Sequence, residues 1–137
     1  MQYASLSNGD QMPLLGLGTW KSESRQVYTA VREAIKIGYR HIDCASVYGN
    51  EKDVGDAIRD AIQNHEVTRS ELWITSKLWS NCHRKDRVEA ALNQSIQNLG
   101  VDYLNLYLIH WPVSIKPEKA FAESVDDLLS PEQSPIS

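Results

Sequence analysis

The chain has 137 residues, of which 42% are hydrophobic, and a formal net charge of −4. This size suits one compact domain or a part of a larger one. The acidic balance and the lack of a basic run argue against a nucleic-acid partner. No apolar run approaches the roughly 18–20 residues of a membrane span, and residues 1–10 do not have the pattern of a secretory signal. The two cysteines have no metal-ligand spacing, so we expect free thiols and a cytoplasmic location.

The first fifteen residues predict a β-hairpin. Residues 3–6 and 12–15 are rich in apolar side chains, and Ser7-Asn8-Gly9-Asp10 separates them. Asn-Gly is a strong signal for a tight hairpin turn, because both residues tolerate positive φ. We therefore expect two short antiparallel strands before the main body of the chain.

The body of the chain repeats a short apolar run, a polar loop and an amphipathic helix. The four apolar runs cover residues 15–19, 41–45, 72–78 and 103–110. The intervening helices show the i, i+3, i+4 and i+7 spacing of a buried face, as in Val27, Ala30, Val31, Ala34 and Ile35. Asn50 is the expected N-cap of the second helix, and Gly38 and Gly100 are expected to end the first and third.

Strands that alternate with helices at this spacing predict βαβ units and a parallel sheet, so the expected fold class is α/β. The sheet could be open and doubly wound, or closed into a barrel. The first run, Gly16-Leu17-Gly18-Thr19-Trp20, lacks the G-x-G-x-x-G pattern of an open dinucleotide-binding sheet. After Trp111-Pro112 the repeat stops, and we expect an irregular loop over residues 114–137, with at most a weak helix around residues 118–129.

Polar side chains stand at the ends of these predicted strands. Asp43 lies near the end of the second strand, Lys77 near the end of the third and His110 at the end of the fourth. The carboxyl ends of parallel strands share one face, where α/β proteins carry their active sites. We therefore expect the three to converge, with Lys77 as the partner of Asp43 and Tyr48 on the loop beside them. Taken singly, each has a structural explanation, such as a turn cap, a solvated lysine or packing.

Together these groups predict acid catalysis at a carbonyl. An ammonium next to a phenol favours the phenolate, and a carboxylate beside the ammonium holds it in place. An imidazole nearby could donate a hydrogen bond to a carbonyl oxygen. Trp20, Trp79 and Trp111 also follow strand ends, and they would either wall an apolar substrate pocket or pack structurally. Trp73 starts a strand at the opposite end, and we interpret it as structural.

The sequence resembles the aldo-keto reductases. The run GYRHIDCASVYGNEKDVG, residues 38–55, is similar to a signature of that family, and MPLLGLGTWKS, ITSKLWS and LNLYLIHWPV resemble its other strand-end motifs. The resemblance implies the N-terminal half of a (β/α)8 TIM barrel with an N-terminal β-hairpin, and NADPH-dependent reduction of aldehydes or ketones. Since no side chain can donate a hydride, this chemistry requires a bound nicotinamide.

The resemblance also implies roles for individual residues. Tyr48 would be the general acid. Lys77, paired with Asp43, would activate it, and His110 would orient the carbonyl of a small-molecule substrate. The substrate pocket would be lined by Trp20, Tyr48, Trp79, His110 and Trp111. The cofactor would lie near Gly18, Thr19, Trp20, Lys21 and Asp43. The resemblance implies no metal ion.

Length is where the chain departs from the family, because a barrel of this type needs roughly 200–250 residues. We expect an incomplete aldo-keto reductase domain over residues 1–137, without the later strands and loops that supply most of the cofactor-binding residues in the family. An open half-barrel would expose strand edges and inner-face residues such as Leu17, Ile42 and Ile74, and should self-associate. The alternatives are a truncated product without enzymatic activity and a regulatory module of the same fold. The sequence indicates neither the carbonyl substrate nor a preference between NADPH and NADH.

Overall fold

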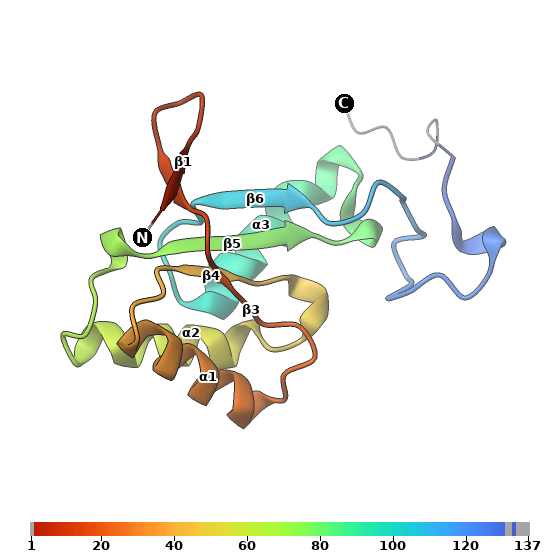
Figure 1. The fold of residues 1–137 in the computed structure, drawn as a ribbon. Helices are drawn as coiled ribbons and strands as arrows, with labels where there is room; N and C mark the ends of the chain where they lie inside the picture. The colour runs from red at the N-terminus through yellow and green to blue at the C-terminus, as the bar shows by residue number, and fades with distance from the viewer. Residues whose placement is uncertain (1, 131–132, 134–137) are drawn as a thin grey trace.

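The computed structural model describes residues 2–130 and 133, and Figure 1 shows their arrangement. Within these residues, a two-stranded antiparallel sheet is followed by a four-stranded parallel sheet with three α-helices. The elements are, in chain order, β1 (Tyr3–Ser5), β2 (Gln11–Pro13), β3 (Leu17–Gly18), α1 (Ser24–Lys36), β4 (His41–Asp43), α2 (Glu51–Gln63), β5 (Trp73–Leu78), α3 (Lys85–Leu99) and β6 (Leu106–Ile109). The parallel strands lie in the order β3-β4-β5-β6. This confirms the predicted α/β fold, half of a (β/α)8 barrel with an N-terminal hairpin.

The hairpin forms where the sequence predicts it, with Asn8 and Gly9 at its tip. Gly9 has a φ of 92°, in the left-handed region that glycine enters freely. The Asn8 side chain accepts a hydrogen bond from the backbone N–H of Asp10 at 3.1 Å. His41, at the start of β4, ties the hairpin to the sheet, since its Nδ1 lies 3.0 Å from the carbonyl oxygen of Pro13. The hairpin therefore sits at the N-terminal ends of the parallel strands (Figure 1).

The apolar core lies between the parallel sheet and the helices. Ile42 and Ile74 are fully buried there. Their helical neighbours in the core are Val27, Val31 and Ile35 of α1, Val54 and Ile58 of α2, and Leu99 of α3. The expectation that Leu17, Ile42 and Ile74 line an exposed inner face is therefore wrong, since Leu17 packs against this core as well. Successive strand residues point to opposite faces, so the inner face receives their neighbours, such as Asp43 and Thr75.

Glycines end α1 and α3 as the sequence predicts. After α1, Gly38 has a φ of 103° and its N–H donates to the carbonyl oxygen of Ile35 at 3.1 Å. The next N–H, that of Tyr39, donates to the carbonyl oxygen of Ala34 at 2.8 Å. These bonds satisfy carbonyls that the last helical turn leaves free. The predicted buried face of α1 is wrong at Ala30, which is exposed because it lies at the edge of the apolar stripe.

Helices α2 and α3 approach each other closely at Gly55. A Cβ built on Gly55 would lie 2.5 Å from the carbonyl oxygen of Leu99. That oxygen belongs to the backbone at the end of α3, so it cannot turn aside as a flexible side chain would. The lack of a side chain at Gly55 therefore lets the start of α2 come within reach of polar groups on α3.

Residues 114–130, called the strap here, follow β6 at the C-terminal ends of the strands (Figure 1). An antiparallel bridge between Ile115 and Leu128 closes the strap. The weak helix expected around residues 118–129 does not form; the described strap contains one 3₁₀ turn, Val125–Asp127. The Asp127 carboxylate accepts a bond from the Glu123 N–H at 3.0 Å, a local bond that competes with a helix. The part of the expected loop at residues 131–132 and 134–137 lies outside the described residues.

Cys44 and Cys82 are free thiols, as expected from the sequence, and Cys44 is fully buried in the core. No helix in the described part of the chain is long and apolar enough to cross a membrane. Residues 2–130 and 133 do not gather three or more His, Cys, Asp or Glu side chains that could hold a metal ion.

Candidate active site

The C-terminal ends of β4 and β5 bring an acidic and a basic side chain together. Lys77 Nζ lies 2.9 Å from one carboxylate oxygen of Asp43 and 3.0 Å from the other. It also donates to the carbonyl oxygen of Cys44 at 2.7 Å. The Lys77 side chain is 12% exposed and that of Asp43 is 36% exposed. The pair predicted from the sequence is therefore present, with an enclosed ammonium and a carboxylate that reaches the open inner face of the sheet.

Tyr48 reaches this pair from the loop after β4. Its hydroxyl oxygen lies 3.4 Å from Lys77 Nζ, and the ammonium lies 5.1 Å from the centre of its ring. Tyr48 ends a 3₁₀ turn, Ser46–Tyr48, and Gly49 leaves that turn in the left-handed conformation, with a φ of 71°. One ammonium therefore contacts both a carboxylate and a phenol.

His110 lies beside Tyr48, immediately after β6. The two rings meet edge to face with their centroids 5.6 Å apart. Nδ1 of His110 is buried and has no hydrogen-bond partner among the described residues. Burial lowers the pKa of His110, and the Lys77 ammonium lowers it further, while Asp43 acts in the opposite direction. The imidazole is therefore neutral at neutral pH and can donate one N–H to a ligand.

An apolar cavity of about 270 Å³ opens beside Tyr48 and His110. Its lining consists of Trp20, Val47, Tyr48, Trp79, His110, Trp111 and Phe121. Trp79 is the centre of this aromatic wall, with three neighbouring ring centroids at 5.0, 5.2 and 5.5 Å, those of Trp111, His110 and Phe121. A cavity with one phenol and one imidazole among aromatic rings suits a small apolar ligand that carries a polar atom.

Val47 and Phe121 are pocket residues that were not predicted from the sequence. Phe121 is the chain's single phenylalanine, and it stands in a mostly polar stretch. That isolated aromatic is the signal that could have found it. Tertiary contacts bring it to the pocket, because Trp79 Nε1 donates a 2.6 Å hydrogen bond to the carbonyl oxygen of the adjacent Ala120.

The loop after β3 carries the residues predicted to lie near a cofactor. Thr19 is buried, and its hydroxyl donates to the carbonyl oxygen of Asp43 at 3.0 Å. The buried amide of Asn50 donates to the carbonyl oxygens of Thr19 and Ser22, at 2.8 and 3.0 Å. Asn50 does occupy the N-cap position of α2, as predicted, but its side chain makes no cap hydrogen bond. It holds the loop after β3 against the start of α2 instead.

The inner face beside Asp43 has room for a ligand. A Cβ built on Gly18 would meet nothing within 4 Å, and Gly18 is paired with Asp43 in the sheet. Trp20 is 66% exposed, and the Lys21 ammonium lies 4.6 Å from the centre of its ring. The open floor and the exposed indole therefore leave space for a ligand beside Asp43.

Comparison with known proteins gives consistent matches. The model of the aldo/keto reductase family matches residues 14–130. An aldo/keto reductase of Synechocystis sp. is 57% identical over 129 residues, which are 94% of this chain and 39% of that protein. The structure of the aldose reductase from Schistosoma japonicum has a TM-score of 0.89 and 40% identity, over 95% of this chain and 44% of that one. A Bombyx mori aldo-keto reductase, solved in complex with NADP, has a TM-score of 0.82 and 44% identity, over 86% of this chain and 41% of that one.

These matches cover nearly all of this chain but only 39% to 44% of each known protein. The stretch matched by the family includes all three strand ends that carry Asp43, Lys77 and His110. The chain therefore belongs to the aldo/keto reductase family.

Proposed function

We propose that this chain carries the catalytic residues of an enzyme that reduces aldehydes or ketones to alcohols with NADPH. One observation carries the proposal: the Lys77 ammonium lies 2.9 Å from the Asp43 carboxylate and 3.4 Å from the Tyr48 hydroxyl, beside an aromatic cavity. A phenol donates a proton effectively at neutral pH only where its anion is stabilised. The ammonium supplies that stabilisation, and the cavity supplies a place for the carbonyl compound.

Each residue has a distinct role in this proposal. Tyr48 donates its proton to the carbonyl oxygen as that oxygen gains negative charge, and Lys77 stabilises the phenolate left behind. Asp43 holds the ammonium in place. The neutral His110 donates an N–H hydrogen bond to the same carbonyl oxygen and so orients it. A bound nicotinamide dinucleotide supplies the hydride that no side chain can provide.

The substrate and the cofactor would occupy neighbouring spaces. We assign the carbonyl substrate to the cavity of about 270 Å³, whose apolar walls include Trp20, Trp79 and Trp111. We assign the nicotinamide to the open inner face, bordered by Gly18, Thr19, Trp20, Lys21 and Asp43. The NADP complex of the Bombyx mori relative supports this cofactor. Walls of indole favour aldehydes and ketones with an apolar or aromatic substituent.

A chimera tests the proposal, because the chain spans 39% of its Synechocystis relative. Residues 1–130 of this chain would replace the matching segment of that reductase, and the unaltered relative would be the control. We expect the chimera to change nicotinamide fluorescence on binding NADPH, and to oxidise NADPH when an aromatic aldehyde is added. A folded chimera that binds NADPH but reduces neither aldehydes nor ketones would contradict the proposal.

We also propose that residues 1–137 alone self-associate. β3 and β6 are the outer strands of the sheet, so each has an edge without a neighbouring strand among the described residues. β6 also leaves apolar side chains uncovered, with Leu108 41% and Ile109 49% exposed. We expect oligomers in size-exclusion chromatography with light scattering, and weak NADPH binding, because four strands cannot close a barrel. A monodisperse monomer that oxidises NADPH with an aldehyde would contradict both expectations.

The two alternatives predict different outcomes of these experiments. A truncated product without activity predicts an inactive 137-residue chain but an active chimera. A regulatory module predicts an inactive chimera, and the assembled Asp43, Lys77 and Tyr48 favour catalysis over this alternative. A cytoplasmic location stays a prediction, which imaging of the fluorescently tagged chain would test.

A further inference from the structure

We propose that Glu51 is a positioning residue for the proton donor Tyr48, an inference that rests on the proposed function above. Glu51 is the first residue of α2, three positions after Tyr48, and it is 3% exposed. Burying a carboxylate is unfavourable unless a cation or hydrogen-bond donors meet it. The hydrogen-bond donors to Glu51 come from β5 and from α3. The buried carboxylate therefore connects the start of α2 to both of these elements.

Each carboxylate oxygen of Glu51 has its own donor. Ser76 Oγ donates to one oxygen at 2.7 Å, and Asn98 Nδ2 donates to the other at 3.2 Å. The first bond joins the start of α2 to β5, and the second joins it to α3. Ser76 is fully buried, so water does not compete for the first bond. Ser76 also directly precedes Lys77 in β5, so the residue that anchors Glu51 is the chain neighbour of the lysine that contacts Tyr48, with its side chain on the opposite face of the sheet.

The turn that carries Tyr48 is thus attached to β5 on both sides. Before Tyr48, the Ser46 hydroxyl donates to the carbonyl oxygen of Lys77 at 3.3 Å. After Tyr48, the bond between Ser76 and Glu51 provides the corresponding attachment. The strand that carries the ammonium therefore also holds both ends of the turn that carries the phenol. Small shifts in such an arrangement are costly, since a misplacement of about 1 Å can lower a rate by about 10²-fold.

A carboxylate suits this position better than a neutral side chain for two reasons. It accepts hydrogen bonds at both oxygens, as Ser76 and Asn98 require. It also places negative charge in the first turn of α2, where the helix dipole is favourable. A glutamine at residue 51 could still accept from Ser76, and Asn98 could turn its amide oxygen toward the glutamine NH₂. Glu51→Gln is therefore the conservative variant, whereas Glu51→Ala removes both attachments.

If Glu51 had a purely structural role, loss of either of its hydrogen bonds should lower stability without lowering kcat. The proposal predicts different effects for the two bonds. The bond to Asn98 connects two helices, so its loss should affect stability alone. The bond to Ser76 connects the Tyr48 turn to the strand of Lys77, so its loss should affect proton transfer. Asn98→Ala and Ser76→Ala therefore separate the two roles of the same carboxylate.

The experiment uses the chimera, with steady-state kinetics and thermal unfolding of each variant. We expect Glu51→Ala and Ser76→Ala to lower kcat by about 10- to 100-fold, with KM for NADPH changed less than about twofold. Glu51→Gln should keep kcat within about threefold, and Asn98→Ala should lower Tm without lowering kcat. The double variant Glu51→Ala/Ser76→Ala should be no slower than Glu51→Ala, because both changes remove the same bond. Glu89→Gln, at an exposed carboxylate of α3, is the matched control.

Unchanged kcat in both Glu51→Ala and Ser76→Ala, measured where the variants are folded, would overturn the inference. An equal fall of kcat in Asn98→Ala would also overturn it, because that pattern indicates a general loss of structure. If Glu51→Ala does not fold, Ser76→Ala decides the question with the same criterion. A parent chimera without reductase activity would overturn the proposed function and this inference together, whereas an active parent with unaffected variants would overturn the inference alone.

Discussion

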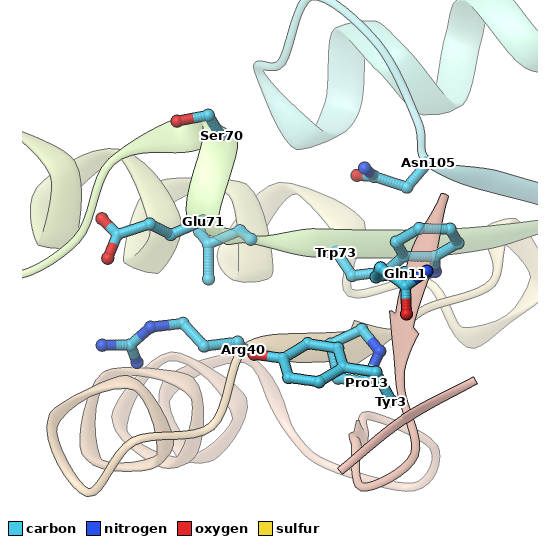
Figure 2. A pocket seen from close by; sticks show the side chains of 9 residues that line it. Tyr3, Gln11, Pro13, Arg40, Ser70, Glu71, Trp73 and Asn105 are labelled. Atoms are coloured by element: carbon cyan, nitrogen blue, oxygen red, sulfur yellow. The ribbon is translucent and has the colours of Figure 1, made fainter. Parts of the chain in front are cut away.

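The two ends of the parallel sheet both carry polar side chains and a cavity, yet they use those side chains differently. At the C-terminal ends of the strands, Tyr48 and His110 border a cavity of about 270 Å³. At the N-terminal ends, a cavity of about 290 Å³ lies between the hairpin and the start of β5 (Figure 2). Its lining consists of Tyr3, Gln11, Pro13, Arg40, Ser70, Glu71, Leu72, Trp73 and Asn105. Volume therefore does not distinguish the two ends.

Polar groups at the N-terminal end are occupied by structural hydrogen bonds. Arg40 donates to two backbone carbonyl oxygens, at 2.8 and 3.0 Å. Glu71 accepts from the Thr68 N–H at 2.8 Å, and Asn105 Oδ1 accepts from the Ile74 N–H at 3.0 Å. Figure 2 shows the charged ends of Arg40 and Glu71 directed away from Asn105. These side chains stabilise loops and strand starts, and they do not converge on one point in the cavity.

Two histidines make the contrast explicit. His41, at the N-terminal end, uses both ring nitrogens: Nδ1 donates to the Pro13 carbonyl oxygen at 3.0 Å, and Nε2 accepts from Thr75 Oγ1 at 2.9 Å. His110, at the C-terminal end, leaves Nδ1 without a partner among the described residues. Trp73 Nε1, at the N-terminal end, is also a buried donor without a partner among the described residues, and Trp73 lines the cavity there with Arg40 and Glu71. The convergence of a carboxylate, an ammonium, a phenol and an imidazole, rather than polarity or volume, therefore distinguishes the C-terminal end as the candidate site.

The strongest change should come from removing the Tyr48 hydroxyl, the proposed proton donor. We expect Tyr48→Phe in the chimera to slow carbonyl reduction by at least about 10²-fold. NADPH binding, followed by nicotinamide fluorescence, should barely change. Tyr3→Phe, at the other cavity, is the matched control and should leave the rate unaltered. Retained activity in Tyr48→Phe would remove Tyr48 from the role of general acid.

Replacing Lys77 should lower both activity and stability. Lys77→Met removes the charge that stabilises the phenolate, so reduction should slow by about tenfold or more. Loss of one partner from a fully buried ion pair costs roughly 3–5 kcal/mol. Because the Asp43 side chain is 36% exposed, water replaces part of the lost cation, and we expect about 1–2 kcal/mol in denaturant unfolding. Lys52→Met, on the exposed side of α2, is the control. If Lys77→Met lowers stability but leaves the rate of reduction unchanged, Lys77 is a structural residue and not a catalytic one.

Thr75→Val tests the hydrogen bond that joins His41 to β5, at a residue that pairs in register with Asp43. It removes the hydroxyl that donates to His41 Nε2 and keeps the shape of a side chain that is 2% exposed. We expect a loss of about 1 kcal/mol in the free energy of unfolding, with kcat unchanged. Denaturant unfolding and kinetics of the chimera measure the two quantities. A fall in kcat at full folding would break the contrast, because it would show that the hydrogen bond of His41 supports the neighbouring Asp43 as well as the fold.

We expect a smaller effect on thermal stability from the protonation of His83, which contacts the strap. His83 is 2% exposed, its Nδ1 lies 2.9 Å from Ser114 Oγ, and burial lowers its pKa. The unfolded state therefore binds the proton more readily, so stability is full above the ordinary pKa of about 6.5 and is lost as pH falls below it. We expect the Tm of the chimera to fall as pH drops from about 6.5 toward 5, and to fall less in His83→Gln. His110 acts in the same direction, so an equal fall in both proteins would assign the effect to His110 or other groups.

Local sequence pattern was enough to predict the kind and order of the helices and strands, and to select one end of the sheet as the candidate site. Helical spacing and glycine stops are properties of neighbouring residues, so α1, α2 and α3 could be recognised without tertiary information. Asp43 and Lys77 could be paired because parallel strands end on the same face. The strand ends were less predictable: β6 covers Leu106–Ile109, not residues 103–110, since a strand extends only where a neighbour pairs with it.

The other features of the fold and of the candidate site depend on contacts between residues that are far apart in the sequence. The face of the sheet on which Ile42 lies depends on how the helices pack. Phe121 lines the pocket because the strap, to which it belongs, packs there. Glu51 at the start of a helix has the pattern of an ordinary exposed first-turn acid, yet it is buried. Its donors, Ser76 and Asn98, lie 25 and 47 residues away. A carboxylate is buried only where such donors meet it, and pairings over these separations leave no periodic pattern in the sequence.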